Sequence, residues 1–288
     1  MSRIDSQQHF TREYLPELLL PILKRNRFDG AVVVAAVPSV LAVPPIPTVP
    51  AIPAVPAIPS APPIPAVPAI SSFPPPPAPP SVEQNRWLLN LAEPHEFIRA
   101  VVCWADLADP NLPALLDEYQ RHPKFRGVIV GLPLPPARFA LQELARRHLT
   151  LELPPHFEIA AEIAEMFPTL LIAIHSLGRP SLMEGMRPED LAALARYPNI
   201  YAKISGLITD APTHWKPQQF APWVRAALAA FGPTRVMYGS DWPSYLPVGT
   251  WKEALAAFTQ ALGPQTLETR EHLLGATAAR FYRLGDSA

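Results

Sequence analysis

The strongest constraint on the fold of this chain is a regular alternation of short apolar segments with amphipathic ones. Eight segments have the pattern of β-strands, and a segment with helical spacing follows each of them. The expected strands are Arg3–Phe10, Gly30–Val37, Ile98–Trp104, Gly127–Leu132, Leu149–Leu153, Thr169–His175, Ile200–Ser205 and Arg235–Tyr238. The expected helices are Pro16–Asn26, Glu83–Ala92, Leu112–Arg121, Pro136–Arg147, Phe157–Met166, Pro188–Tyr197, Pro222–Phe231, Trp251–Leu262 and, last, Thr266–Tyr282.

This alternation predicts an α/β fold, a single (β/α)8 or TIM barrel over residues 1–288. A doubly wound open sheet is the alternative, but it usually has fewer units and often carries a Gly-rich phosphate-binding turn after its first strand. No G-x-G-x-x-G sequence follows Phe10. In a barrel, catalytic residues are expected at the carboxyl ends of the strands.

An uncharged, proline-rich tract interrupts the alternation after the second strand. The chain has 40 prolines, and no charged residue occurs from Gly30 to Val82. Proline stands at every third position in segments such as Val49–Pro59, where it removes backbone donors and breaks helical turns, so the tract cannot be a membrane-spanning helix. A period of three is typical of polyproline II instead.

The triplets Pro38-Ser39-Val40 and Pro80-Ser81-Val82 match each other and mark the ends of the tract. Removal of residues 41–82 would leave a loop of ordinary length between a strand and a helix. We therefore interpret residues 41–82 as a proline-rich insertion in one loop of the barrel. An insertion without function, a ligand for a proline-binding module and a lid packed on the barrel are its alternative roles.

Charge and cysteine content limit the partners and the compartment. Lys plus Arg number 24 and Asp plus Glu number 25, so there is no basic excess to neutralise a nucleic-acid backbone. Cys103 is the only cysteine, which rules out an intramolecular disulfide and favours a reducing compartment. No basic segment followed by an apolar one near Met1 indicates a signal peptide. We expect a cytoplasmic protein that acts on a small molecule, and neither on nucleic acid nor on a membrane.

Polar side chains stand at the ends of several expected strands. The first strand ends in Asp5-Ser6-Gln7-Gln8-His9, where Gln7 and His9 share a face because side chains alternate along a strand. The polar residues and the tryptophan at the other strand ends are His156, His175, Lys203, Asp241 and Trp242. Because the carboxyl ends of barrel strands meet at one rim, we expect these groups to converge. Asp241, after the eighth strand, is well placed to bind a metal or to take a proton from water.

Several motifs, taken in order, resemble those of amidohydrolase-related proteins (amidohydrolase family 2). The combination of HPKFRG, LGRP, KISGL, YGSDWP and ATAARFY is similar to sugar lactonases of the L-fuconolactonase and L-rhamnonolactonase type, and more distantly to 2-pyrone-4,6-dicarboxylate lactonase. The resembling stretches are Ile4–Phe10, Phe28–Ala35, Glu83–Asp106, His122–Val128, Leu177–Pro180, Asn199–Leu207, Met237–Pro243 and Gly275–Leu284.

The resemblance implies a TIM barrel of the metal-dependent hydrolase type that cleaves a carbon–oxygen bond in a cyclic sugar ester, with one divalent metal such as zinc or with none. It implies that Asp241 is the general base that activates water and that His9 is the remaining member of a histidine pair on the first strand. Lys203 and Trp242 are implied to line the substrate pocket. The expected site residues are, as catalytic groups, Asp241, His9 and His175; as substrate contacts, Gln7, His156, Lys203 and Trp242; and as metal ligands, His9 and Asp241.

Three departures from the family pattern fall within the expected site. Gln7 stands where the family has His, and an amide oxygen is a weak ligand for a transition metal. Ile129-Val130-Gly131 follows the FRGV element, where the family has a His, and His175-Ser176 replaces Asp-His. A one-residue shift on a strand turns a side chain to the other face, so the direction of His175 is left open.

Three function hypotheses follow. In the first, a lactone hydrolase, Asp241 activates water, and His9 with Lys203 or a weakly held metal stabilises the oxyanion. In the second, the barrel has lost catalysis and keeps a binding or scaffolding role. In the third, the chain is an adaptor whose proline tract recruits a partner.

Overall fold

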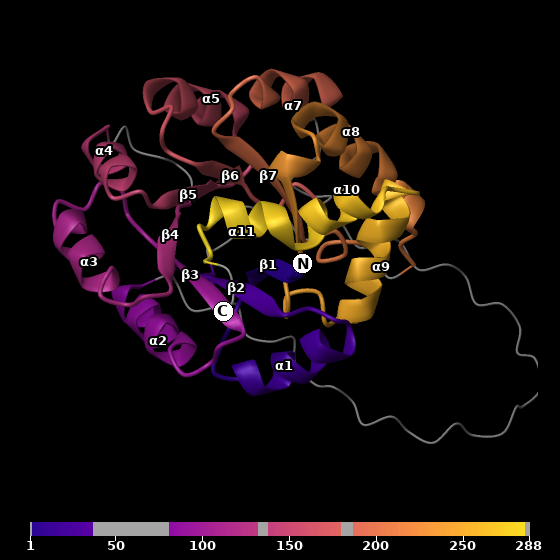
Figure 1. Cartoon of the computed structure of the whole chain (residues 1–288), viewed down its shortest axis with the longest axis horizontal. Coiled ribbons are helices and arrows are strands. Elements are labelled where there is room, and N and C mark those ends of the chain that lie inside the picture. Colours follow the sequence, from indigo (N-terminus) through magenta and orange to yellow (C-terminus); the bar gives the residue numbers. More distant parts are fainter. Residues whose placement is uncertain (1, 37–80, 132–137, 180–186, 213, 286–288) are drawn as a thin grey trace, which may run out of the picture.

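Eight parallel strands, paired in sequence order from β1 to β8, form the centre of the molecule (Figure 1). The computed structural model describes residues 2–36, 81–131, 138–179, 187–212 and 214–285. The strands are β1 Ile4–Gln8, β2 Gly30–Val34, β3 Ile98–Trp104, β4 Phe125–Ile129, β5 Thr150–Leu153, β6 Ile172–Ile174, β7 Ile200–Ser205 and β8 Val236–Gly239. The prediction of a TIM barrel is confirmed.

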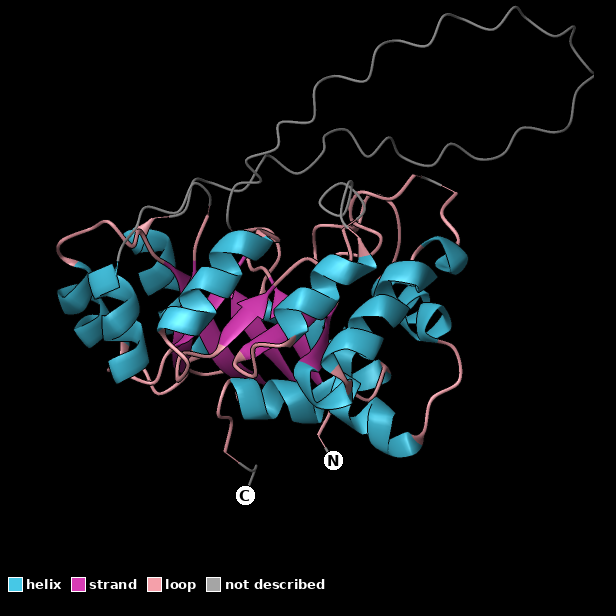
Figure 2. Ribbon diagram, turned by 90° about the horizontal axis from the view of Figure 1, so that it is seen from above, coloured by secondary structure: helices cyan, strands magenta, loops and turns pink. Residues whose placement is uncertain are grey.

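Helices form a ring around the strands in Figure 1, and Figure 2, turned by 90°, shows them on either side of the strands. They are α1 Pro16–Arg25, α2 Val82–Ala92, α3 Leu112–Tyr119, α4 Arg138–Arg146, α5 Phe157–Met166, α7 Pro188–Ala195, α8 Ala221–Phe231, α9 Trp251–Leu262, α10 Leu267–Glu271 and α11 Thr277–Phe281. All five residues of β2 are buried, as expected for a parallel strand covered on both faces. No helix among the described ranges is long and apolar enough to cross a membrane.

The expected last helix is two short helices separated by a π-helical turn, η3 (His272–Ala276). At Gly275 a Cβ atom would lie 2.0 Å from the Ser2 carbonyl oxygen, so only a residue without a side chain fits against the N-terminal segment. The backbone leaves the helical conformation at Gly275, where φ is 179 and ψ is -56. The turn and α11 lie across the end of the barrel where β1 begins (Figure 1).

The insertion ends where α2 begins. Ser81 is the N-cap of α2, and its hydroxyl oxygen accepts a hydrogen bond from the Gln84 N–H at 3.1 Å. The helix therefore starts at Val82, one residue before the expected start. The rest of the insertion, residues 41–80, lies outside the described residues.

The seam between β8 and β1 is closed by residues just beyond the strands. The Asp241 N–H donates to the Gln7 carbonyl oxygen at 3.1 Å, and the His9 N–H donates to the Trp242 carbonyl oxygen at 2.8 Å. A parallel bridge joins Gln8 to Trp242. The residues that complete the barrel are thus the ones in which the sequence predicts the site.

Candidate active site

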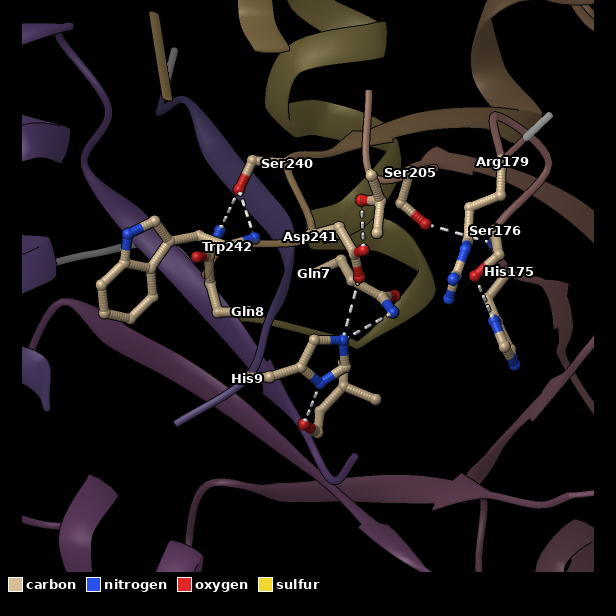
Figure 3. A network of polar contacts seen from close by, with 12 residues as sticks. Gln7, Gln8, His9, His175, Ser176, Arg179, Ser205, Ser240, Asp241 and Trp242 are labelled. Atoms are coloured by element: carbon tan, nitrogen blue, oxygen red, sulfur yellow. Dashed lines mark hydrogen bonds and ion pairs between the residues drawn. The ribbon is translucent and has the colours of Figure 1, made fainter. Parts of the chain in front are cut away.

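Polar side chains from β1, from the segments after β6 and β8, and from the end of β7 meet at the carboxyl ends of the strands. Figure 3 shows this network from close by. Its labelled members are Gln7, Gln8, His9, His175, Ser176, Arg179, Ser205, Ser240, Asp241 and Trp242. Three of the predicted site residues, Gln7, His9 and Asp241, are in direct contact with one another.

Asp241 is a buried carboxylate with a partner on each oxygen. Its Oδ1 lies 3.0 Å from His9 Nε2, and its Oδ2 accepts a hydrogen bond of 2.7 Å from the Thr209 hydroxyl. Burial alone would raise the pKa of the carboxyl, but the contact with His9, the charge of Arg179 and the Thr209 hydroxyl together hold that pKa below its usual range. Asp241 is therefore ionised at neutral pH.

His9 is oriented through both ring nitrogens. Its Nδ1 lies 2.9 Å from the Val34 carbonyl oxygen, and because a carbonyl only accepts, Nδ1 carries a proton. Its Nε2 faces the Asp241 carboxylate at 3.0 Å, a geometry in which a proton on Nε2 makes a charge-assisted hydrogen bond to Oδ1. The Gln7 amide nitrogen lies 3.3 Å from the same Nε2, and the amide oxygen has no hydrogen-bond partner among the described residues. A rotation of the amide by 180° would exchange its nitrogen and oxygen and place that oxygen opposite a proton on Nε2.

Asp5 anchors the segment that precedes Asp241. Its Oδ1 accepts from the Ser240 N–H at 2.8 Å, and its Oδ2 accepts from the Trp251 indole N–H at 2.9 Å. Burial raises the pKa of Asp5 to about 6, against the opposing effect of these donors. Asp241 itself has φ 68, a left-handed conformation that Asp tolerates better than most residues. The turn that carries Asp241 is thus fixed from behind by β1 and α9.

The loop after β7 supplies two contacts that the sequence did not indicate. Thr209 reaches Asp241, and Asp210 holds the Arg179 guanidinium with two hydrogen bonds of 2.9 and 2.7 Å. Gly206, in the same loop, has φ 71, and a Cβ atom there would lie 2.5 Å from Arg179 Cγ. Glycine at this position lets the arginine stem pass close to the backbone. The LGRP and KISGL motifs contain Arg179 and Gly206, but no motif pointed to Thr209 or Asp210.

His175 and Ser176 follow the short strand β6. The prediction extended this strand to His175, whereas β6 ends at Ile174, so both residues stand beyond it. His175 Nδ1 lies 2.8 Å from the Ser176 hydroxyl oxygen, and the Ser176 N–H donates to the Ser205 hydroxyl at 3.1 Å. Figure 3 shows His175 in the same network as His9 and Asp241, and the charges of both residues act on the pKa of its ring.

Lys203 is paired inside the barrel. Its ammonium lies 2.7 Å from Glu152 Oε2, both side chains are fully buried, and the Tyr282 hydroxyl donates to the other Glu152 oxygen. Burial lowers the pKa of Lys203, and the ion pair with Glu152 opposes that shift. The charge of the Lys203 ammonium is thus balanced by Glu152. The expectation that Lys203 lines the substrate pocket stays a prediction.

Trp242 and His156 lie at the margins of the network. The Trp242 ring is 1% exposed and packs edge-on against Phe10 and Tyr14, with ring centroids 6.0 and 5.6 Å away. His156 is the N-cap residue of α5. Within the part of the chain that the structure describes, no hydrogen bond or ion pair joins His156 to His9 or Asp241. Their expected substrate contacts stay predictions.

The residues present do not fit a transition-metal centre. Within the described ranges, no group of three or more His, Cys, Asp and Glu side chains could hold a metal ion. His9 and Asp241 supply two donors, and the neighbouring Gln7 amide is a weak ligand, whereas zinc sites in proteins use three or four side-chain ligands. The steps proposed below therefore involve the side chains alone.

Comparisons with known proteins bear on the chemistry of this site. A sequence profile of the amidohydrolase family matches residues 76–284. An L-fucono-1,5-lactonase from Burkholderia ambifaria is 32% identical over 228 residues, which cover 70% of this chain and 76% of that protein. An L-fucono-1,5-lactonase from Burkholderia multivorans is also 32% identical, over 240 residues that cover 72% of this chain and 78% of that protein.

Solved structures share the fold. The crystal structure of an amidohydrolase from Burkholderia multivorans with bound zinc superposes with a TM-score of 0.75 at 23% identity, covering 99% of this chain and all of that one. The structure of a 2-pyrone-4,6-dicarboxylic acid hydrolase candidate from Pseudomonas putida superposes with a TM-score of 0.65 at 20% identity, covering 99% of each chain. At these identities the structural similarity shows a shared barrel fold and nothing of the reaction.

Proposed function

The chain belongs to the amidohydrolase family, and from that premise we propose that it is a lactonase, which opens the ring of a cyclic sugar ester. The two L-fucono-1,5-lactonases, each 32% identical to it over the aligned residues, support this substrate class. The substrate is accordingly a small molecule, an aldono-1,5-lactone.

The observation that carries the proposal is the Asp241 carboxylate, which is ionised, buried and fixed at both oxygens at the carboxyl end of β8. A carboxylate held in this way can accept a proton from water without first being reoriented. The position after a barrel strand is also where catalytic groups of this fold are found.

In the proposed reaction, Asp241 takes one proton from a water molecule as the water oxygen attacks the lactone carbonyl carbon. The new carbon–oxygen bond gives a tetrahedral oxyanion. When the ring carbon–oxygen bond breaks, the ring oxygen takes up the proton that the pair of His9 and Asp241 holds, and the products are one carboxylic acid and one hydroxyl group. The water is the only co-reactant.

The His9 imidazole, whose Nε2 lies 3.0 Å from Asp241 Oδ1, is assigned to stabilise the oxyanion through a proton on that nitrogen. Lys203 is less suited to that task, because its ammonium is neutralised by Glu152. Arg179 forms an ion pair with Asp210, but its positive charge also lowers the pKa of Asp241 and so favours the ionised carboxylate.

The test is hydrolysis of a panel of aldono-1,5-lactones, beginning with L-fucono-1,5-lactone, measured above the spontaneous rate. Asp241→Asn is expected to lower kcat/KM by about a hundredfold or more, because it removes the general base and keeps the shape. Asp117→Asn, at an exposed carboxylate on α3, is the matched control and should leave the rate unchanged. Wild-type rates equal to background across the panel would refute the proposal and return the non-catalytic hypothesis.

A further inference from the structure

His175 Nε2 is a buried polar atom without a hydrogen-bond partner among the described residues. The residue is only 9% exposed, so bulk water does not solvate this atom freely. A buried donor or acceptor without a partner is unfavourable, because it has lost its hydrogen bonds to water and gained none in the protein. His175 follows β6 in the network that also contains His9 and Asp241 (Figure 3). An unpartnered atom there is expected to bind a group that enters the site, and the question is whether it donates or accepts.

The contact with Ser176 decides between the two neutral forms of the imidazole. If the Ser176 hydroxyl donates to Nδ1, the ring proton is on Nε2, and Nε2 alone lacks a partner. If Nδ1 donates to the hydroxyl oxygen, both the hydroxyl proton and the Nε2 lone pair lack partners within the described residues. The first arrangement leaves one unsatisfied group in place of two, so the proton is placed on Nε2.

The surrounding charges keep the ring neutral. Burial lowers the pKa of His175 from its ordinary 6.5 to about 3, and the positive charges of Lys203, His9 and Arg179 act in the same direction. Only Asp241 opposes them. A neutral ring cannot be a proton source, but it can donate a hydrogen bond from Nε2.

The backbone holds the pair in place. Ser176 has φ 57, in the left-handed region that few non-glycine residues occupy. Its N–H is bound by the Ser205 hydroxyl, and the next N–H, of Leu177, donates to the Lys203 carbonyl oxygen at 3.2 Å. The segment after β6 is thus tied to β7 on both sides of the serine, which fixes the hydroxyl relative to the ring.

We propose that His175 is a neutral donor that binds an oxygen atom of the lactone substrate through its Nε2–H, and that Ser176 is the positioning residue that sets this tautomer. The substrate part of this assignment rests on the lactonase function proposed above. The assignment of the tautomer does not rest on that function, so an experiment can refute the tautomer and the substrate contact separately.

The tautomer is tested on the full chain without substrate. Two-bond 1H–15N correlation spectra of protein labelled with 15N-histidine report which ring nitrogen carries the proton, and His175→Gln identifies the His175 signals. We expect a protonated Nε2 and a bare Nδ1 between pH 7.5 and 5. An Nδ1–H tautomer, or an imidazolium at pH 7.5, would overturn the proposal whether or not the protein hydrolyses any lactone.

The role of Ser176 is tested in the same spectra. Ser176→Ala removes the hydroxyl and should give a mixture of the two neutral tautomers at His175. Ser81→Ala, which removes the helix-capping hydroxyl of α2 far along the chain from β6, should leave the single tautomer intact. A single Nε2–H tautomer in Ser176→Ala would overturn the positioning role.

The substrate contact is tested by kinetics on the aldono-1,5-lactone that the wild type hydrolyses fastest. His175→Gln keeps an N–H donor near the Nε2 position, whereas His175→Leu is of similar size and keeps none. We expect the Leu variant to lose about ten- to a hundredfold in kcat/KM and the Gln variant to retain activity within about fivefold of wild type. Equal losses in the two variants, or no loss in the Leu variant, would overturn the contact.

Discussion

His9 Nε2 lies 3.0 Å from Asp241 Oδ1, and this contact joins the first and the last strand of the barrel. The backbone N–H groups of the same two residues donate across the β1–β8 seam to Trp242 and Gln7. The pair is therefore part of the closure of the fold as well as the centre of the candidate site. Its geometry is set by the barrel, which explains how a carboxylate and an imidazole 232 positions apart come into register.

A second imidazole at position 7 should create a zinc site. The Gln7 amide already reaches His9 Nε2 at 3.3 Å, so Gln7→His would bring a third strong donor next to His9 and Asp241. We expect zinc affinity at least about tenfold higher than in the wild type, measured by competition with a chromophoric chelator and by metal content. Gln8→His is the control, because the Gln8 side chain points instead to Ser240. Equal zinc binding by the two variants would contradict this prediction.

The Thr209 hydroxyl should matter through Asp241. Thr209→Val removes the 2.7 Å hydrogen bond to Oδ2 and keeps the shape of the side chain. Because hydrogen bonds to charged groups contribute about 1.5–3 kcal/mol, kcat for lactone hydrolysis should fall about ten- to a hundredfold, with a smaller change in KM. Thr209→Ser should restore most of the rate. If the Ser and Val variants were equally slow, the hydroxyl would have no part in orienting the carboxylate.

Removal of one partner from the Lys203–Glu152 ion pair should destabilise the barrel. Lys203→Met leaves a fully buried carboxylate without its cation, which costs about 3–5 kcal/mol of the free energy of unfolding. Glu152→Gln added to that variant should recover part of the loss and still accept from Tyr282. Urea unfolding measures both. Arg86→Met, which breaks the exposed pair with Glu118, should change stability little. If the double variant lost the sum of the stabilities that the two single variants lose, Lys203 and Glu152 would not be energetically coupled.

His175 should make the fold sensitive to acid. Its pKa is about 3 in the folded protein and 6.5 in an unfolded chain, so the unfolded state binds the extra proton between these values. The stability that neutral His175 contributes is present above pH 6.5 and is lost as the pH falls below it. From pH 7.5 to 5.5 the wild type should lose about 1 kcal/mol more than His175→Gln, measured by urea unfolding at each pH. A parallel decline of the two proteins would refute this.

The strand and helix pattern was predictable because each element buries one face or both. Ile98–Trp104, Phe157–Met166, Ile200–Ser205 and Trp251–Leu262 have the bounds that the sequence predicted. The strand ends were less predictable. Thr169–His175 reads as one apolar strand, but only Ile172–Ile174 pairs within the sheet, since Ser176 turns into a left-handed conformation. Local hydrophobicity does not report where a strand leaves the sheet.

The site was predictable only in part. Gln7, His9 and Asp241 stand at strand ends, where the barrel must bring them together. Thr209 and Asp210 belong to a loop without a motif, and their partners Asp241 and Arg179 lie about thirty positions away. The sequence did not indicate that Glu152 is the partner of Lys203. A single charged residue within an apolar strand does not show which other strand carries the opposite charge. The role of the proline tract and the cytoplasmic location stay predictions.

The sequence by itself determined the barrel, its strand order and the identity of the groups at its carboxyl rim, because periodicity fixes which residues face inward and chain order fixes which strands are neighbours. The tertiary structure decided the pairing: which oxygen of Asp241 meets His9, which ring nitrogen of His175 meets the Ser176 hydroxyl, and which carboxylate neutralises Lys203. Those outcomes depend on distances of about 3 Å between residues far apart in the chain, and hydrogen bonds are lost when such distances grow by less than an ångström.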